Sequence, residues 1–176
     1  MSWTSPRTWV TGETPSAATC NTHVRDNVQY LYDNQFRGAR AVLSANQSIS
    51  NSTETSASWG SAPIDTDGLW SGGSPTRLTV PAVLAGQVEI RGWAEFAAAA
   101  SGYRYAKIRK NGATDIAYAV NNHKDGSSAR TVGMAVATAD TAAAADYYEL
   151  RVFQTSGGAL NITAAACFLH LVFRGA

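Results

Sequence analysis

The side chains that could catalyse a reaction are too scattered along the sequence to form a recognisable catalytic set. The three histidines are His23, His123 and His170, and no two of them have the spacing of metal ligands. The sequence has no Gly-x-Ser-x-Gly nucleophile motif, no phosphate-binding loop and no His-Glu-x-x-His motif. We therefore predict no catalytic residues, no metal ligands and no cofactor, and hence a protein that is not an enzyme.

The acidic side chains fit turns better than they fit catalysis. The segment Asp65 to Gly68 (DTDG) resembles the start of a calcium-binding loop, but Ser71 to Gly73 follow where further oxygen ligands are needed. A turn stabilised by Asp side chains accounts for the same residues. A carboxylate pair that the fold brings together, as in glycosidases, is the catalytic alternative that remains open.

An aromatic and basic band in the chain could instead bind a partner. Its members are Tyr103, Arg104, Tyr105, Lys107, Arg109 and Tyr118. The band suits an ordinary solvated sheet face, a subunit interface or a surface that stacks on sugars. We favour the interface, since aromatic residues and Arg are enriched at interfaces while Lys is depleted, which leaves Lys107 and Lys110 nearer the rim. The predicted trimer-interface residues are Tyr103, Tyr105, Tyr118, Phe153, Phe168 and His170.

His170 stands between Leu169 and Leu171 in an apolar segment, which is typical of a core or interface histidine. Three copies of it around an axis could form a metal or anion site.

The composition argues against two classes of partner. The formal net charge is +1 and 15% of the 176 residues are charged, which does not suit a protein that coats nucleic acid. No segment approaches the ~20 apolar residues of a membrane span, and residues 1–15 lack the apolar core of a signal peptide.

The two cysteines, Cys20 and Cys167, are far apart in the sequence, so we expect two free thiols and synthesis in a reducing cytoplasm.

The N-terminal residues predict an arm followed by one helix. Residues 1–14 show no regular period, and the exposed tryptophans Trp3 and Trp9 must dock on the chain's own body, a sister subunit or a host assembly. Thr14 is the expected N-cap of a helix from Pro15 to about Asn34. Its apolar stripe consists of Ala17, Cys20, Val24, Val28 and Leu31.

Two interpretations of this helix remain open. It lies on the β body, or it joins two other copies around a three-fold axis with Asn27 fixing the register. Gly38 is expected to end the region, which gives an N-terminal unit of residues 1–38 and a head of residues 39–176.

The remainder of the chain alternates with the period of β-strands. The clearest element is a hairpin over Tyr103 to Val120, with Asn111-Gly112 at its turn. In Gln87 to Phe96 the even-numbered residues should face the core. The last strand is apolar on both faces, which places it in the middle of a sheet with its second face covered, most economically by another subunit. About eight to ten short strands with regular turns indicate a β-sandwich, and ARAVLSANQSI is expected to be the first strand.

Several stretches resemble the jelly roll shared by complement-type globular heads and tumour-necrosis-factor-like trimers. They are DTDGLWSGGSPTRLTVP with the following GQVEIRGWAEF, YRYAKIRKNGATDIAY, VATADTAAAADYYELRVFQTSGG and FLHLVFRGA. Gln87 stands where that family usually has an aromatic residue after the glycine. The resemblance implies an all-β fold, a trimeric jelly-roll sandwich preceded by an extended arm and one α-helix.

The N-terminal stretch from Ser2 to Leu31 resembles a module common in small virion proteins of tailed bacteriophages. The shared pattern is a tryptophan-bearing arm, Gly-Glu, and a helix carrying Asn-x-x-Val-Arg-Asp-Asn, although Pro15 replaces a more usual hydrophobic or small residue. In such proteins the module anchors a variable β head to the particle. The resemblance implies capsid-anchoring roles for Trp3, Pro6, Arg7 and Trp9, and anchoring or trimer contacts for Val24, Asn27, Val28 and Leu31.

The leading hypothesis is therefore a homotrimeric capsid decoration or minor capsid protein on the virion surface, bound to the major capsid protein or another virion protein. One alternative is a tail-tip or fibre head that binds a host-surface glycan. Another is a carbohydrate-active enzyme on the same scaffold.

Overall fold

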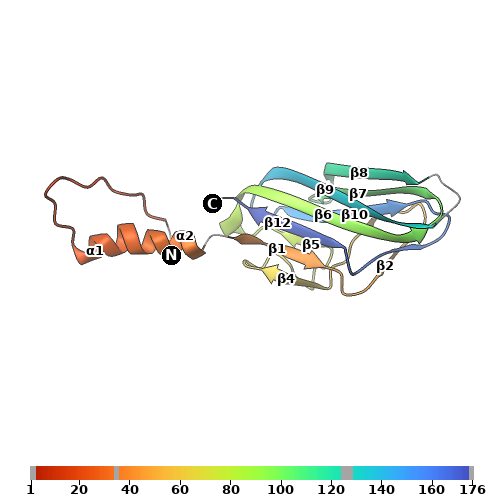
Figure 1. Cartoon of the computed structure of the whole chain (residues 1–176), viewed down its shortest axis with the longest axis horizontal. Helices are drawn as coiled ribbons and strands as arrows, with labels where there is room; N and C mark the ends of the chain where they lie inside the picture. Colours follow the sequence, from red (N-terminus) through yellow and green to blue (C-terminus); the bar gives the residue numbers. More distant parts are fainter. Residues whose placement is uncertain (1–2, 34–35, 124–128, 175–176) are drawn as a thin grey trace. The chain divides into compact units, whose positions relative to one another are not determined.

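The computed structural model describes residues 3–33, 36–123 and 129–174. The chain divides into two compact units, Met1–Phe36 and Arg37–Ala176 (Figure 1). Gly38 does not end the N-terminal unit but is the second residue of the first strand, so the observed boundary precedes the expected one by two residues. The second unit is called the head below.

The N-terminal unit consists of an extended arm and one helix in three consecutive segments. These are α1 (Ala17–Cys20), the π-helical turn η1 (Asn21–Arg25) and α2 (Asp26–Asp33). The N-cap is Ser16 rather than the expected Thr14, because the Ser16 hydroxyl accepts the Thr19 N–H at 3.1 Å. In the described part of the chain, none of the helices is long and apolar enough to cross a membrane.

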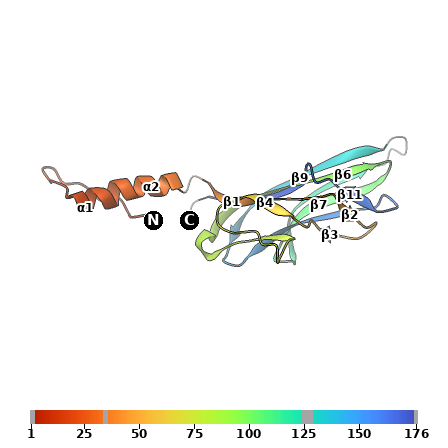
Figure 2. The same cartoon turned by 90° about the horizontal axis from the view of Figure 1, so that it is seen from below.

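The head consists of two antiparallel sheets whose long strands run lengthwise (Figures 1 and 2). Sheet A contains β2 (Gln47–Ile49), β11 (Leu160–Ile162), β6 (Gly86–Ala99), β12 (Phe168–Phe173), β1 (Arg37–Val42) and β4 (Ser61–Asp65) in that order, with β9 (Arg130–Ala142) also paired to β6. Sheet B contains β3 (Thr55–Ser56), β10 (Tyr147–Gln154), β7 (Gly102–Lys110) and β8 (Thr114–His123), with β5 (Arg77–Thr79) also paired to β10. A short 3₁₀ turn, η2 (Ala82–Leu84), precedes β6.

The core forms between the sheets as the alternation predicts. The expected inward residues Val88, Ile90, Ala94 and Phe96 of β6 are buried. Alternate residues of β10 and β12 are buried as well: Tyr148, Leu150, Val152, Leu169, Leu171 and Phe173. β12 pairs with β1 on one side and β6 on the other, which confirms that the last strand lies in mid-sheet. Its outer residues are only partly buried within one chain.

The central hairpin is formed by β7 and β8. Asn111 and Gly112 adopt φ values of 52° and 69°, as the sequence predicts for this turn. Asp146 accepts the Asn111 amide at 2.8 Å, the Ala143 N–H at 2.9 Å and the Lys110 ammonium at 2.9 Å. These bonds lower the pKa of Asp146 to about 2 and fasten the hairpin turn to the loop before β10.

Two loop predictions had different outcomes. The DTDG segment is a bend: Asp65 accepts the Leu69 and Trp70 N–H groups, and Asp67 pairs with Arg37. Because the Asp65 and Asp67 carboxylates bind groups of the chain itself, the prediction of a turn is confirmed.

The prediction of one strand over ARAVLSANQSI is wrong, since a bend at residues 43–46 separates β1 from β2. Within this bend the Asn46 side chain accepts the Ala164 N–H at 2.9 Å. This bond favours a bend over continued strand pairing of the backbone.

Replacing Gly38 should destabilise the head. At its φ of 155° a Cβ would collide with the backbone carbonyl of Leu171 on the paired strand, which cannot move without breaking the ladder between β1 and β12. We expect Gly38→Ala to lower the free energy of unfolding by about 1–3 kcal/mol in urea denaturation. Gly72→Ala is the matched control, because nothing lies within 4 Å of its Cβ position. Equal stability of the two variants would contradict the packing described.

Candidate interaction surfaces

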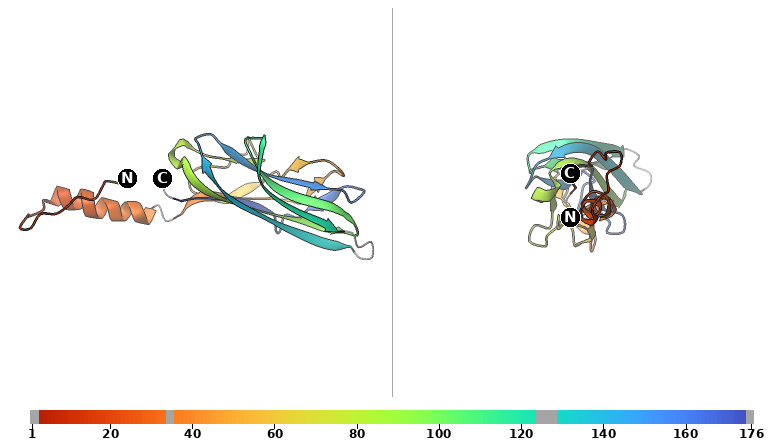
Figure 3. Two further views of the ribbon diagram at one scale, coloured as in Figure 1. Left: turned by 90° about the horizontal axis from the view of Figure 1, so that it is seen from above. Right: turned by 90° about the vertical axis from the view of Figure 1, so that its left-hand side faces the viewer.

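The arm of the N-terminal unit is fastened to the helix by Asn27. The Asn27 side chain donates to the Thr4 carbonyl at 2.8 Å and accepts the Thr4 N–H at 3.0 Å. The Trp3 ring lies 6.1 Å from that of Tyr30, one turn along the helix, and the arm runs back beside the helix (Figure 3, left). Asn27 thus has a role within one chain that the sequence did not indicate, while its register-fixing role between copies stays a prediction.

A second face of the same helix is apolar and exposed. Val24, Val28 and Leu31 are 52%, 62% and 58% exposed. They follow at spacings of four and three residues, which is the seam spacing of a coiled coil. The arm covers the neighbouring face around Asn27 and leaves these three side chains uncovered within the N-terminal unit. We call this surface the helix seam.

The four predicted anchoring residues lie on the arm and remain accessible. Trp3 and Trp9 are 45% and 44% exposed, and Pro6 is exposed as well. Arg7 pairs with Glu13 at 2.6 Å, and its guanidinium lies 4.9 Å from the centre of the Trp9 ring. These contacts shape the arm but do not bury its tryptophans.

The outer face of sheet A carries an ordered set of side chains across β1, β12, β6 and β9. One row across the sheet is Val42, Phe168, Trp93 and Ala135, and the next row is Arg40, His170, Arg91 and Ala137. Arg40 lies over the Phe168 ring at 4.8 Å. A Cβ at Gly133 would collide with the Trp93 ring, so the indole packs against β9 where this glycine leaves room for it. The result is a level surface that combines aromatic rings with small residues.

His170 sits among cations on this face. Burial and the charges of Arg91 and Arg40 lower the pKa of His170, so the imidazole is neutral at pH 7. Within the described residues, no group of three or more His, Cys, Asp or Glu side chains is placed to hold a metal ion.

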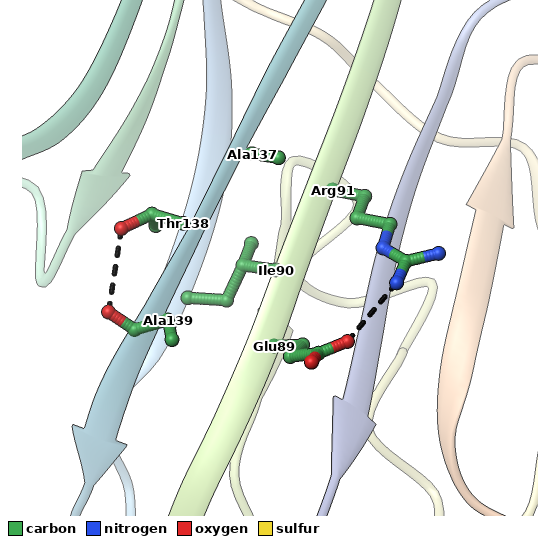
Figure 4. A pocket seen from close by; sticks show the side chains of 6 residues that line it. All are labelled: Glu89, Ile90, Arg91, Ala137, Thr138 and Ala139. Atoms are coloured by element: carbon green, nitrogen blue, oxygen red, sulfur yellow. Dashed lines mark hydrogen bonds and ion pairs between the residues drawn. The ribbon is translucent and has the colours of Figure 1, made fainter.

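A shallow hollow of about 310 Å³ opens between β6 and β9 on this face (Figure 4). Its lining residues are Glu89, Ile90, Arg91, Ala137, Thr138 and Ala139. The Glu89 carboxylate, the acidic group in this set, pairs with Arg91 at 3.0 Å and with Arg174 at 2.8 Å. The hydrogen bond from Arg174 is the largest of the effects that lower the pKa of Glu89. These residues offer polar contacts but no nucleophile with an adjacent base.

The other predicted interface residues lie on sheet B and form an aromatic cluster. We call Tyr103, Tyr105, Tyr118 and Phe153 the aromatic platform. Tyr105 and Phe153 stack with 4.8 Å between ring centres and 7° between ring planes, and Tyr118 lies 5.3 Å from Tyr105. The hydroxyls of Tyr103 and Tyr118 bond to each other. The six predicted interface residues are therefore divided between two different sheets, four on sheet B and two on sheet A.

A compact set of ion pairs borders the aromatic platform. Glu54 accepts bonds from the Tyr105 hydroxyl at 2.6 Å and pairs with Arg109 at 3.0 Å and Arg151 at 3.1 Å. Lys107 pairs with Glu54 at 2.5 Å and with Asp115 at 2.7 Å. Burial opposes ionisation of Glu54, yet the bonds from Lys107 and Tyr105 outweigh it and lower the pKa of Glu54.

Arg104 does not belong to the outer aromatic and basic band that the sequence predicts. It is 0% exposed and shares the inner face of β7 with Ala106 and Ile108, because alternate residues of a strand point to the same side. Two residues of these surfaces, Trp93 and Glu54, were not among the predicted site residues. Trp93 lies on the outward set of β6 and could have been found from that alternation, whereas Glu54 lies in a polar connection with no periodic signal.

No family model and no curated protein matches this chain. Solved structures do match its fold. A TNF named Eiger from S. frugiperda aligns with a TM-score of 0.54 and 15% identity over 80% of this chain and 93% of that one. Murine APRIL at pH 8.0 aligns with a TM-score of 0.57 and 12% identity, and at pH 5.0 with 0.56 and 10%; each covers 79% of this chain and 99% of the other. The head therefore has the TNF-like jelly-roll fold.

Removing the Asn27 side chain should release the arm. We expect Asn27→Ala to shift tryptophan emission to longer wavelength and to speed proteolysis after Arg7, because both bonds to Thr4 are lost. Asn21→Ala is a suitable control, since Asn21 is exposed on the same helix. If the two variants behave alike, Asn27 does not hold the arm.

The stability of the head should fall as the pH falls below about 6.5, the unfolded pKa of His. The unfolded chain takes up a proton there, while the folded state resists protonation of His170 because its pKa is lowered. We expect His170→Gln to reduce the loss of unfolding free energy between about pH 7.5 and 5.5, measured by urea denaturation. An unchanged pH dependence in this variant would contradict the environment assigned to His170.

Proposed function

We propose that the chain is a non-enzymatic structural protein of a tailed-bacteriophage particle, a homotrimer whose N-terminal units attach three jelly-roll heads to the shell. It acts on the virion surface as a capsid decoration or minor capsid protein, and its partner is the major capsid protein or another virion protein. The proposal is supported by the resemblance of residues 2–31 to a virion anchoring module and by the jelly-roll head. The observation that carries it is the exposed helix seam of Val24, Val28 and Leu31.

The helix seam favours association in the N-terminal unit. Three aliphatic side chains, each more than half exposed at coiled-coil spacing, lose contact with water if helices of neighbouring copies meet along them. The seam has three aliphatic side chains over about two helical turns, so the apolar area that it can bury is small. A second contact in the head is therefore needed to hold the copies together.

The outer face of sheet A is suited to that second contact. Phe168 and Trp93 supply flat aromatic surface, and Ala135 and Ala137 on β9 let another chain approach closely. In a closed three-fold ring each contact joins two different patches, so a second patch of one copy covers this face of the next. The proposal assigns Phe168 and His170 to the covered face and places the covering patch outside the four rings of the aromatic platform, because charged groups such as those around the platform are depleted in interface cores.

The arm is the part of the chain that we assign to the shell. Trp3 and Trp9 are partly exposed although the arm is fastened by Asn27, so their rings can enter pockets of another protein. Three arms per trimer raise the overall affinity well above that of one arm, because the second and third contacts become intramolecular.

Charge placed in the helix seam should weaken self-association. We expect light scattering of the full chain to give about three times the 18.6 kDa of one chain. The double variant Val24→Asp, Val28→Asp should raise the protein concentration at which half of the trimer is dissociated by at least about tenfold. The reason is that burying unpaired carboxylates in the helix seam costs free energy. Thr22→Asp, at an exposed position of the same helix, is the control. A wild-type chain that is monomeric at micromolar concentration would contradict the trimer.

Attachment can be tested on particles purified from the organism that encodes the chain. We expect the chain to sediment with them and Trp3→Ala with Trp9→Ala to reduce its occupancy strongly, since both rings lie on the accessible arm. The double variant should retain the trimer mass, which separates loss of attachment from loss of assembly. Recovery of the wild-type chain only from the particle-free fraction would refute the proposed role.

A further inference from the structure

We propose that the outer face of sheet B is a binding site for a neutral saccharide, with Tyr118 as its main stacking ring. The site consists of the aromatic platform, the adjoining ion pairs and the outermost strand β8. This inference does not depend on attachment to a particle, and it uses a face of the head that the proposed trimer leaves free.

The rings of the platform are held in place before any ligand arrives. Tyr105 is fixed by stacking on Phe153 and by the bond from its hydroxyl to Glu54. Tyr103 packs edge-on against Phe153 with 6.2 Å between ring centres, and its hydroxyl bonds to that of Tyr118. Rings with fixed orientation lose little conformational entropy on binding, which is an advantage for a weak ligand such as a sugar.

Accessible surface is concentrated on β8, the last strand in the pairing order of sheet B. Tyr118 is 53% exposed and Val120 is 51% exposed. Asn122, also exposed, pairs with Tyr103 in the ladder between β7 and β8. An apolar ring, an aliphatic side chain and an amide therefore follow one another along one open strand.

The charges beside the platform nearly balance. Four cations, Lys107, Arg109, Arg151 and Arg77, lie among three carboxylates, those of Glu54, Asp115 and Glu149, with Arg77 and Arg109 on the two strands that flank Glu149. The hydrogen bond from Arg109 is the largest effect that lowers the pKa of Asp115, so its carboxylate is charged at neutral pH. A nearly balanced face of this kind gives little net attraction to a sulfated or uronic acid polymer, or to the phosphates of a nucleic acid.

A protein partner fits this face less well than a sugar. Charged residues are depleted in the centre of protein interfaces, whereas here Lys107 lies 5.4 Å from the centre of the Tyr105 ring and Glu54 accepts the Tyr105 hydroxyl. Fixed charged groups next to an aromatic ring suit a hexopyranose, because its C–H face can pack on the ring while its hydroxyls bond to charged side chains. Lys107 is directly opposite Tyr118 in the ladder but is 7% exposed and paired with Glu54 and Asp115. The Asp115 side chain is 38% exposed and is therefore the more accessible charged group for a sugar hydroxyl.

The test uses the full chain and saturation-transfer NMR with four neutral probes: cellotetraose, maltotetraose, mannotetraose and chitotetraose. Trigalacturonic acid is the anionic comparator. We expect at least one neutral probe to bind with a dissociation constant of about 0.1–10 mM and the anion to bind no more tightly. Raising the salt concentration should leave the affinity for the neutral probe unchanged, since no charge is neutralised on binding.

Variants then locate the site. Tyr118→Ala should weaken binding at least about fivefold, and Tyr118→Phe, which keeps the ring, by no more than about threefold. Tyr32→Ala is the control, because Tyr32 is a 70% exposed tyrosine in the N-terminal unit. The inference is overturned if none of the four probes binds, if Tyr118→Ala binds as well as Tyr32→Ala, or if the anion binds best. It is also overturned if Tyr118→Ala dissociates the oligomer, because the platform would then be a subunit interface.

Discussion

The alternation of side chains along β6, β7, β10 and β12 is the constraint on which the remaining features of the head depend. Every second residue enters the shared core, so the intervening residues form the two outer faces. The two outer faces differ in chemistry. Sheet A presents rings and small residues in rows across four strands, while sheet B presents an aromatic cluster joined to ion pairs. Because a shift of one residue in register would exchange inner and outer side chains, the core maintains both surfaces.

Much of the fold followed from local patterns in the sequence, whereas the surfaces depended on contacts distant in sequence. The hairpin turn at Asn111-Gly112 and the buried side of β6 need only neighbouring residues, and both predictions are confirmed. Local patterns cannot indicate that Glu54 reaches Arg151, nor on which sheet Phe153 and Phe168 lie. Strand period alone would have assigned Arg104 to the core, but its charge suggested an outer position.

In the N-terminal unit some polar groups bond within the chain while several apolar side chains stay exposed. The Asn27 side-chain amide makes two hydrogen bonds to the backbone of Thr4, and these bonds hold the arm beside the helix. The aliphatic seam and the two arm tryptophans stay exposed. Exposed apolar groups of this kind mark sites of association in soluble proteins. The anchoring and association roles predicted for these residues from their types and spacing stay predictions, and the sequence did not indicate that Asn27 holds the arm.

The central claim is that copies of this chain cover sheet A and leave sheet B open to a ligand. Hydroxyl-radical footprinting of the oligomer tests it most directly, because Trp93 and Tyr118 report on the two faces separately. The account predicts that Trp93 and Phe168 are protected in the oligomer and react after dilution to monomer, while Tyr118 reacts equally in both. Protection of Tyr118 with a reactive Trp93 in the oligomer would contradict it.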